Sequence, residues 1–469
     1  MAGAPLPGAA PWTEPALGTA GAGTEPAPGT AGAPGPAPAT AEPAAAGTQA
    51  GPGTQAAAGA QAAGAQAAGA QAVAGTDPDA VMDAGMDAAA TAPAPRRVLI
   101  VSATIGEGHN ATGRALEETI RQISPGCDVR WLDVLDAMGP GIGPMARAFY
   151  VMQVERTPWI YEFFYRAIWR YRWFLIWSKR LIGSWCGRTM ARAIRRYGPD
   201  MIISTYPLGS AGLSWLRDHR RLDAPAGAWV SDFCPHPYWL YGAMDVTYVM
   251  HESAVPVAEA AEPGARVRVG AMPVTSRFQP GDRAEARRRL GIAEHSFVAL
   301  LTTGSLGFGR SGQAVRALLA GHPDVEVVAV CGHNEQRRRR LEGFGFPDGR
   351  VRILGWTDDM PGWITAADVV LTNGGGMTVL EAIACGRPVI MFDPIPGHGK
   401  TNASLMASSG TGLLCESPAE LTEAIRELVT DPEARARLEK KEADAVGGRG
   451  RDDDLRDLAS LSVDAPRAR

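Results

Sequence analysis

Residues 96–111 read RRVLIVSATIGEGHNA and decide the fold of the first half of the chain. A short apolar run rich in β-branched residues ends in the glycine turn Gly106-Glu107-Gly108-His109, and a helix-length segment follows at residues 111–123. Strand, glycine turn and helix in this order are typical of a parallel sheet covered by helices. Four more apolar runs, mostly separated by helix-length segments, lie at residues 128–134, 201–205, 226–231 and 246–250. The sequence therefore predicts an α/β domain over residues 96–280.

A second alternating series follows a charged helix expected at residues 282–290. Its apolar runs lie at residues 297–303, 325–331, 350–354, 368–371 and 388–392. We predict two successive doubly wound, Rossmann-like α/β domains, the second over residues 281–430, with the ligand crevice at the carboxyl ends of the strands. Residues 431–469 are expected to form a helix and then a charged tail, whose alternating signs between Arg449 and Asp457 indicate a solvated, fraying surface.

Residues 1–95 differ in composition from the rest of the chain. They contain no Lys or Arg and consist mostly of Ala, Gly, Pro, Thr and Gln, so they bury too little apolar surface to offset chain entropy. We expect this segment to be disordered. The remaining residues are nearly balanced in charge, so the basic runs at residues 287–289 and 337–340 are interpreted as solvated helix faces and not as nucleic-acid sites.

The six cysteines are scattered singly, without a C-x-x-C pair, which argues against a zinc site or a disulfide framework. No basic segment precedes an apolar leader. The uncharged stretches are too short, or too rich in Gly, Ala and Pro, to span a bilayer. These features predict a cytoplasmic protein.

The most informative glycine loop lies at residues 371–382, which read LTNGGGMTVLEA. An apolar strand delivers Gly374, Gly375 and Gly376 to the start of a helix. Backbone N–H groups at such a start bind phosphate, and glycine lets a pyrophosphate approach closely. Glu381, about one and a half turns into the helix, is close enough to accept hydrogen bonds from ribose hydroxyls. A tight turn with a solvated acid is the alternative, because a lone glycine fingerprint is weak evidence.

Two further loops belong to the same predicted domain. Residues 302–309, TTGSLGFG, follow its first strand, so two glycine turns converge on one crevice. Residues 392–402, FDPIPGHGKTN, form a rigid polar loop before the next helix, and this loop is suited to cradle a sugar.

With these motifs the chain resembles nucleotide-sugar glycosyltransferases of the two-Rossmann-domain (GT-B) kind, specifically the family of monogalactosyldiacylglycerol synthases and processive diacylglycerol glucosyltransferases. The resemblance covers about residues 97–440. It rests on four ordered motifs: SATIGEGH at 102–109, VGAMPV at 269–274 with Arg277 and Phe278, the element at 374–381, and PIPG at 394–397 with Lys400 and Asn402.

The resemblance implies that the second domain binds a UDP-sugar, with the diphosphate at the two glycine loops, the ribose on Glu381 and the uracil beside Trp356. The family usually has Gln-Glu where this chain has His398-Gly399, so the identity of the sugar stays open. The implied donor-binding residues are Gly304, Ser305, Gly307, Trp356, Gly375, Gly376, Met377, Thr378, Glu381, Pro396, Gly397, His398, Lys400 and Asn402.

In the first domain the resemblance implies that His109 faces the reaction centre. We interpret it as the general base, a role suited to an imidazole near pH 7, although a lone histidine at a helix start is otherwise a capping or surface residue. Glu107 is the alternative base, and Asp232 either orients His109 or acts as base itself. The acceptor-site candidates are Gly108, His236 and Trp239. No metal or other cofactor is expected, because the spacing lacks a third ligand and a helix start supplies the stabilisation.

Residues 159–185 hold five tryptophans among other aromatics, interleaved with Arg166, Arg170, Arg172, Lys179 and Arg180. Amphipathic rings beside cations suit the headgroup layer of an anionic membrane. A core helix with a solvated basic face is the alternative. The pattern predicts peripheral docking on the inner face of the cell membrane.

Together these features predict an inverting, metal-independent glycosyltransferase that moves a hexose from a UDP-sugar to a lipid acceptor, diacylglycerol in the first place. Two alternatives stay open. One is transfer of N-acetylglucosamine to a polyprenyl-linked or other non-glycerolipid acceptor. The other is a catalytically silent, nucleotide-sugar-binding membrane protein, which the His398-Gly399 departure allows.

Overall fold

The computed structural model describes residues 95–347, 349–445 and 450–461. The expectation of disorder for residues 1–95 therefore concerns a segment that, apart from Pro95, lies outside the described residues.

The first half of the described chain is built on a six-stranded parallel sheet in the order β2-β1-β3-β4-β5-β6. Its strands are β1 (Arg97–Ser102), β2 (Asp128–Asp133), β3 (Met201–Ser204), β4 (Ala226–Trp229), β5 (Val246–Val249) and β6 (Val267–Val269). The helices are α2 (Gly108–Ile123), α3 (Val134–Met138), α4 (Ile142–Arg156), α5 (Pro158–Arg170), α6 (Arg172–Tyr197), α7 (Pro207–Asp218) and α8 (Val255–Ala261), with short 3-10 turns η1 (Pro237–Trp239) and η2 (Glu252–Ala254).

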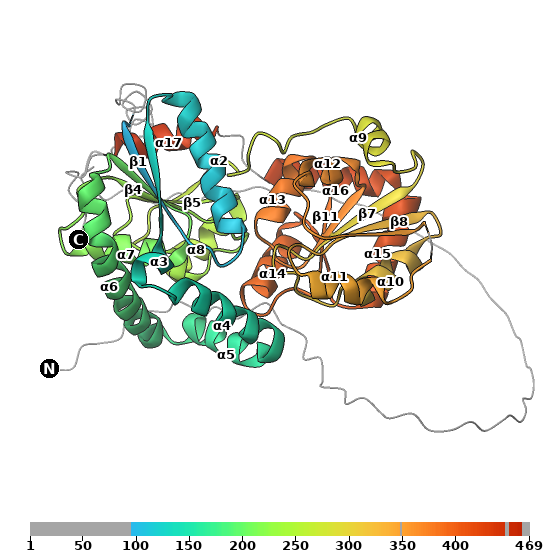
Figure 1. Ribbon diagram of the computed structural model, residues 1–469, viewed down its shortest axis with the longest axis horizontal. Helices are drawn as coiled ribbons and strands as arrows, with labels where there is room; N and C mark the ends of the chain where they lie inside the picture. The colour runs from blue at the N-terminus through green and yellow to red at the C-terminus, as the bar shows by residue number, and fades with distance from the viewer. Residues whose placement is uncertain (1–94, 348, 446–449, 462–469) are drawn as a thin grey trace, which may run out of the picture. The chain divides into compact units, whose positions relative to one another are not determined.

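The second half repeats this plan with the order β12-β11-β10-β7-β8-β9, again all parallel. Its strands are β7 (Phe297–Thr302), β8 (Val325–Val330), β9 (Val351–Leu354), β10 (Val369–Thr372), β11 (Val389–Phe392) and β12 (Leu413–Cys415). Its helices are α9 (Arg283–Leu290), α10 (Ser311–Gly321), α11 (Glu335–Glu342), α12 (Met360–Ala366), α13 (Met377–Ala384), α14 (His398–Ser409), α15 (Pro418–Thr430) and α16 (Pro432–Ala445). Figure 1 shows helices on both faces of each sheet. The predicted α/β class with two doubly wound sheets is confirmed.

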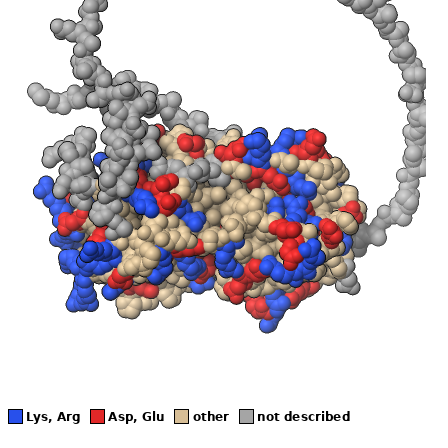
Figure 2. All heavy atoms as spheres, turned by 90° about the horizontal axis from the view of Figure 1, so that it is seen from above, with Lys and Arg blue, Asp and Glu red and all other residues tan. Residues whose placement is uncertain are grey.

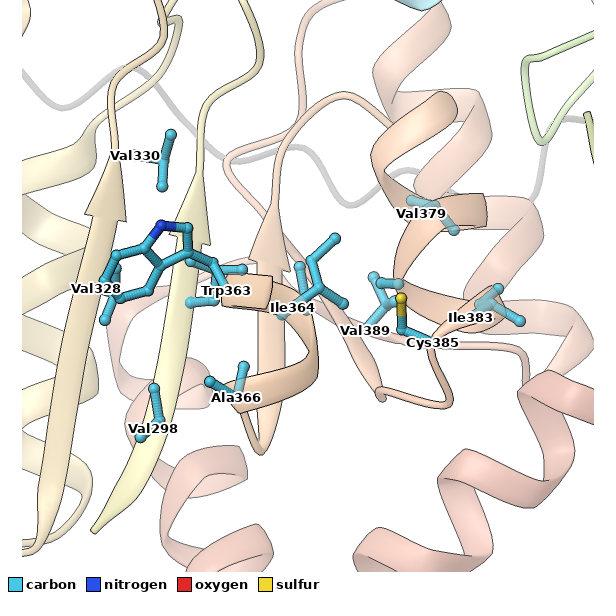
Figure 3. Close-up of a cluster of buried hydrophobic side chains, with 14 of the residues drawn as sticks. Val298, Val328, Val330, Trp363, Ile364, Ala366, Val379, Ile383, Cys385 and Val389 are labelled. Carbon is cyan, nitrogen blue, oxygen red and sulfur yellow. The ribbon is translucent and has the colours of Figure 1, made fainter. Parts of the chain in front are cut away.

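The central strands of both sheets are apolar along their whole length because helices cover both of their faces. In the second half β7, β10 and β11 are buried throughout, and Val298, Val328 and Val389 pack with Trp363 and Val379 of the covering helices. Figure 3 shows this cluster between the strands and α12 and α13. A rigid base of this kind fixes the loops at the carboxyl ends of the strands.

The last described helix, α17 (Arg451–Ser460), returns to the first sheet and lies near α2 in Figure 1. Leu455 and Leu458 are buried in the core of the first half, and buried Asp454 accepts a hydrogen bond from the backbone N–H of Ala271 (2.6 Å). The expectation of a solvated, fraying surface was therefore wrong for this segment. Among the alternating charges, Leu455 and Leu458 are three residues apart and therefore form an apolar stripe on one face of the helix, which the charge pattern did not indicate.

The charged surface does not carry a single sign. On the face shown in Figure 2, acidic and basic side chains are interspersed over the right-hand half, and basic side chains gather at the left end. Such mixing is typical of an ordinary solvated surface.

Candidate active site

A cavity of about 1130 Å³ opens where the carboxyl ends of the two sheets face each other. Its walls come from the turn between β1 and α2, the loop after β4, and the loops after β7, β10 and β11. Ligand sites of doubly wound folds lie at this edge of the sheet, and the volume is large enough for a nucleotide sugar.

Most of the predicted site residues meet in this cavity. Those that line it are Glu107, Gly108, His109, Asp232, His236, Gly304, Ser305, Trp356, Gly375, Gly376, Met377, Thr378, Glu381 and His398. Those that do not line it are Trp239, Gly307, Pro396, Gly397, Lys400 and Asn402. Residues predicted from four separate segments of the second half and two of the first thus share one space.

The start of α13 is a candidate anion site. The helix begins at Met377 without a side-chain cap, and the backbone N–H groups of Gly376, Met377 and Thr378 have no hydrogen-bond partner among the described residues. A Cβ on Gly376 would point into open space, with the Ser231 carbonyl oxygen 3.8 Å away. Unpaired N–H groups and the positive end of the helix dipole favour a phosphate group at this point.

Loops of the two halves touch around this helix start. The Phe233 N–H donates to the carbonyl of Gly375 (3.2 Å), and the Cys234 N–H donates to the side-chain oxygen of Asn402 (2.7 Å). Across the other side, the Glu107 N–H donates to Ser305 Oγ (3.3 Å). These bonds hold loops of the first half against the turns that precede α10 and α13.

Glu381 lines the cavity one turn further along α13, and its carboxyl group makes no ion pair or hydrogen bond with other described residues. Burial raises the pKa of its carboxyl group to about 8. The group is therefore largely protonated at neutral pH until a ligand supplies hydrogen-bond donors that favour the carboxylate.

His109 lies at the start of α2, with its ring edge-on to Tyr206 (4.8 Å between ring centroids) and 5.8 Å from Trp239. Its Nδ1 atom is buried and makes no hydrogen bond of good geometry. Burial lowers the pKa of His109, an effect that the charge of Asp232 and the backbone of Thr205 oppose. The imidazole is thus neutral near pH 7 and able to accept a proton.

Asp232 is the acidic centre of the cavity. Burial alone would raise its pKa, but His398, His236 and His109 around it, together with a hydrogen bond from the Trp239 indole, hold the pKa below its ordinary value. That indole donates to Oδ2 at 2.8 Å, and Nε2 of His236 lies 3.8 Å from the same oxygen. No hydrogen bond joins Asp232 to His109. Trp239 is completely buried, so it acts on the site through Asp232.

The remaining predicted residues support the loops from behind. Asn402 is fully buried and bonds Cys234 as well as the carbonyl of Gly374 (3.4 Å). Gly307 adopts a φ of +70°, and a Cβ there would lie 2.8 Å from Asn334 Cβ, so its turn requires glycine. Lys400 pairs with Glu162 at 3.3 Å, outside the cavity.

Trp356 forms part of the rim. It is 48% exposed and stacks on His333, with 4.0 Å between ring centroids and an 11° angle between planes. An exposed stacked pair of this kind is suited to receive a flat aromatic base.

Several cavity residues were not predicted from sequence as site residues. They are Tyr150 and Tyr161 from α4 and α5, Tyr206 before α7, and His333 after β8. Tyr206 and His333 follow the carboxyl ends of strands β3 and β8, which is a signal that sequence reasoning could have used. Tyr161 belongs to the stretch 159–185, whose aromatic residues were all assigned to one surface, whereas Tyr150 lies on α4, outside that stretch.

Among residues 95–347, 349–445 and 450–461, no helix combines the length and apolar composition that crossing a bilayer requires. The same residues contain no group of three or more His, Cys, Asp or Glu arranged to hold a metal ion.

Comparisons with known proteins agree on one family. Residues 109–264 match the family model described as monogalactosyldiacylglycerol (MGDG) synthase, and residues 301–431 match the model described as glycosyl transferases group 1. Processive diacylglycerol beta-glucosyltransferase of Bacillus subtilis is 24% identical over 351 residues, which are 74% of this chain and 90% of that protein. The protein of the same name from Bacillus cereus strain AH187 is 25% identical over 350 residues, 71% and 86% of the two chains.

Among solved structures, one from Listeria monocytogenes, assigned to UDP-N-acetylglucosamine 2-epimerases, superposes with a TM-score of 0.50 at 15% identity. The match covers 77% of this chain and 94% of that chain. It supports the fold alone, two Rossmann-like sheets around a cleft. With the family matches, which extend over both halves, the chain is a glycosyltransferase of the GT-B kind, and it is similar to the family of monogalactosyldiacylglycerol synthases and processive diacylglycerol glucosyltransferases.

Proposed function

We propose that this glycosyltransferase moves a hexose from a UDP-sugar to the free hydroxyl of diacylglycerol, with inversion at the anomeric carbon. The observation that carries the proposal is that one cavity combines an uncapped helix start with a buried neutral histidine. Residues 96–280 supply the acceptor side and residues 281–430 the donor side. The names of the processive diacylglycerol glucosyltransferases given above indicate the same class of acceptor for those proteins.

The donor fits the second half of the cavity in one orientation. The diphosphate lies at the N–H groups that begin α13 and at the Gly304-Ser305 turn, the ribose lies at Glu381, and the uracil lies at the Trp356–His333 pair. The hexose then lies toward Asp232 and His109. In this arrangement the diphosphate, which is the leaving group, lies on the cavity wall formed by the donor side.

The chemistry is a single displacement. His109 accepts the proton of the acceptor hydroxyl while that oxygen bonds to the anomeric carbon, and the bond from this carbon to the diphosphate oxygen breaks. The base and the leaving group lie on opposite walls of the cavity, which supports attack from the face opposite the leaving group. Asp232 stabilises the imidazolium that forms, and the helix start stabilises the leaving diphosphate.

The proposal is tested by incubating purified protein with UDP-glucose, UDP-galactose or UDP-N-acetylglucosamine, each with vesicles containing diacylglycerol or a polyprenyl phosphate. We expect transfer of a hexose to diacylglycerol, and a β configuration at the new linkage by the proton coupling constant in NMR. Transfer only to the polyprenyl acceptor would favour that alternative. UDP binding without transfer to any acceptor would identify a silent binding protein.

We predict that UDP binding releases a proton from Glu381. The pKa of the free group is about 8, and ribose hydroxyls donate to the carboxylate, so the ligand prefers the ionised form. Affinity should therefore rise by up to about tenfold per pH unit between pH 7 and 8 and fall toward lower pH.

Calorimetry with UDP at several pH values measures this dependence. The control is Glu381→Gln, which keeps the shape of the side chain and should bind UDP more weakly with a flat profile over the same range. A flat profile in the unaltered protein would contradict the role given to Glu381.

Membrane docking is proposed for a surface formed by α4, α5 and α6, called here the docking face. Trp159 is 69% exposed and Trp173 is 70% exposed, although large apolar side chains are normally buried. The exposed apolar side chains of the docking face are Met145, Phe149, Met152, Trp159, Phe163, Phe164, Trp173, Ile176, Trp177, Leu181 and Trp185. Exposed arginines accompany them, as expected for the headgroup layer of an anionic leaflet.

We predict that replacing Arg170, Arg172 and Arg180 with Gln weakens binding to anionic vesicles by on the order of 100-fold, because each basic residue near the surface contributes about 1 kcal/mol. Arg166 is left in place since it pairs with Glu162 (3.0 Å). Vesicle sedimentation measures the effect.

The matched control replaces Arg192, Arg195 and Arg196 with Gln, which removes the same charge from the far end of α6. It should leave sedimentation nearly unchanged. Equal loss in both variants would show a general charge effect, and no loss in the first would remove these arginines from the docking face.

A further inference from the structure

The loop that carries His398 is held by a helix of the other half of the molecule. Three hydrogen bonds join α5 to this loop. They link Tyr161 Oη with His398 Nδ1 (3.1 Å), the Gly397 N–H with a carboxylate oxygen of Glu162 (2.9 Å), and Tyr165 Oη with Thr401 Oγ1 (2.8 Å). The acceptor side therefore sets the position of a donor-side loop.

Only one of these three contacts faces the cavity. Tyr161 and His398 both line it, whereas Tyr165 and Thr401 do not. Nδ1 of His398 is engaged by Tyr161, and Nε2 has no hydrogen-bond partner among the described residues. Burial lowers the pKa of His398, so the ring is neutral and offers a single nitrogen to a ligand.

The position after His398 is closed to a side chain. A Cβ on Gly399 would lie 3.0 Å from Ile395 Cβ and 3.2 Å from the carbonyl oxygen of Asn373, tighter than ordinary contacts. Lys400 and Asn402 point elsewhere, to Glu162 and to Cys234. His398 is therefore the polar side chain through which residues 397–402 reach the cavity.

His398 also lies near the reacting groups. It lines the same cavity as Asp232 and His109 and is close enough to both to influence their pKa values. It also begins α14, whose Asn402 lies against Gly375, one of the glycines that precede α13. In the proposed donor orientation, a hexose that lies between the diphosphate and His109 lies next to the His398 imidazole.

We propose that Tyr161, on the acceptor side, is a positioning residue for the donor hexose. It fixes the tautomer and orientation of the His398 imidazole, which stands where the family resemblance implies a contact to a sugar hydroxyl. The inference rests on the proposed function and assigns part of donor selection to a helix of the acceptor side. Because α5 also carries Trp159 and Phe163 of the docking face, sugar selection and membrane contact share one helix.

The test compares the affinities of UDP, UDP-glucose and UDP-galactose for the unaltered protein and for Tyr161→Phe. We expect the affinity for UDP to stay the same. The ratio between the two UDP-hexoses should move toward one by about two- to tenfold, the range of one lost hydrogen bond. In a His398→Ala background the Tyr161→Phe change should have no further effect on this ratio.

Tyr165→Phe is the matched control, because it removes a hydroxyl from the same helix that bonds the same loop outside the cavity. It should leave the ratio unchanged. An unchanged ratio in Tyr161→Phe, or an equal change in Tyr165→Phe, would overturn the inference while leaving the proposed function intact. Failure of the unaltered protein to bind UDP or either UDP-hexose would overturn the proposed function itself.

Discussion

His109→Ala is expected to reduce turnover by about two to four orders of magnitude while UDP affinity is preserved, the usual range for loss of a general base. His109 lines the cavity on the acceptor side, and the contacts expected for UDP come from the other half. Because burial lowers the pKa of His109, turnover of the unaltered protein should decline on the acid side of the ordinary histidine value and not at neutral pH.

A second variant separates the proton transfer from packing. His109→Gln keeps a polar side chain of similar reach between Tyr206 and Trp239 but cannot accept the proton as a base. It should lose as much turnover as His109→Ala. Full turnover in either variant, measured with UDP binding intact, would exclude His109 and move the base to Asp232 or Glu107.

Gly376→Val is expected to weaken UDP binding by on the order of 100-fold and to abolish transfer at ordinary donor concentrations. The Cβ meets only the Ser231 carbonyl at 3.8 Å, so the fold tolerates the side chain, but the added methyl groups occupy the space before the free N–H groups of Met377 and Thr378. Loss of two hydrogen bonds to a charged phosphate, about 1.5 kcal/mol or more each, gives this magnitude.

Gly126→Val is the matched control, because a Cβ at Gly126 meets nothing within 4 Å and the residue lies outside the cavity. Thermal unfolding should show both variants folded, and calorimetry should show a loss of UDP affinity in Gly376→Val alone. Unchanged affinity there would remove the diphosphate from the start of α13.

Most strands of the two sheets were predictable because they are short apolar runs, and the glycine loops follow such runs. The strands β6 and β12 were not predicted, since each has only three residues. The loops at 102–109, 302–309 and 371–382 all reach the cavity, since carboxyl ends of parallel strands share one edge. Sequence alone could not show that Asn402 and Trp239 act from behind the cavity. Their side chains are as polar or aromatic as those that line it, and only packing distinguishes them.

The aromatic stretch at 159–185 shows what helical periodicity adds. Tyr161 and Tyr165 are four residues apart and face the protein, while Trp159 and Phe163, also four apart, face outward. Treating the stretch as one surface missed the inner pair. In the same way, the leucines of α17 were overlooked among charged residues. The composition of a segment does not distinguish the buried face of a helix from its exposed face, whereas the period of 3.6 residues does.

The central claim is that one cavity transfers a hexose from a UDP-sugar to a membrane lipid. It is tested most directly by incubating purified full-length protein with radiolabelled UDP-glucose or UDP-galactose and vesicles that contain diacylglycerol and anionic lipid, then measuring label in the organic extract. We expect label in a hexosyl diacylglycerol, dependent on diacylglycerol and lost in His109→Ala. Absence of lipid-linked label with every UDP-hexose, from protein that binds UDP, would contradict it.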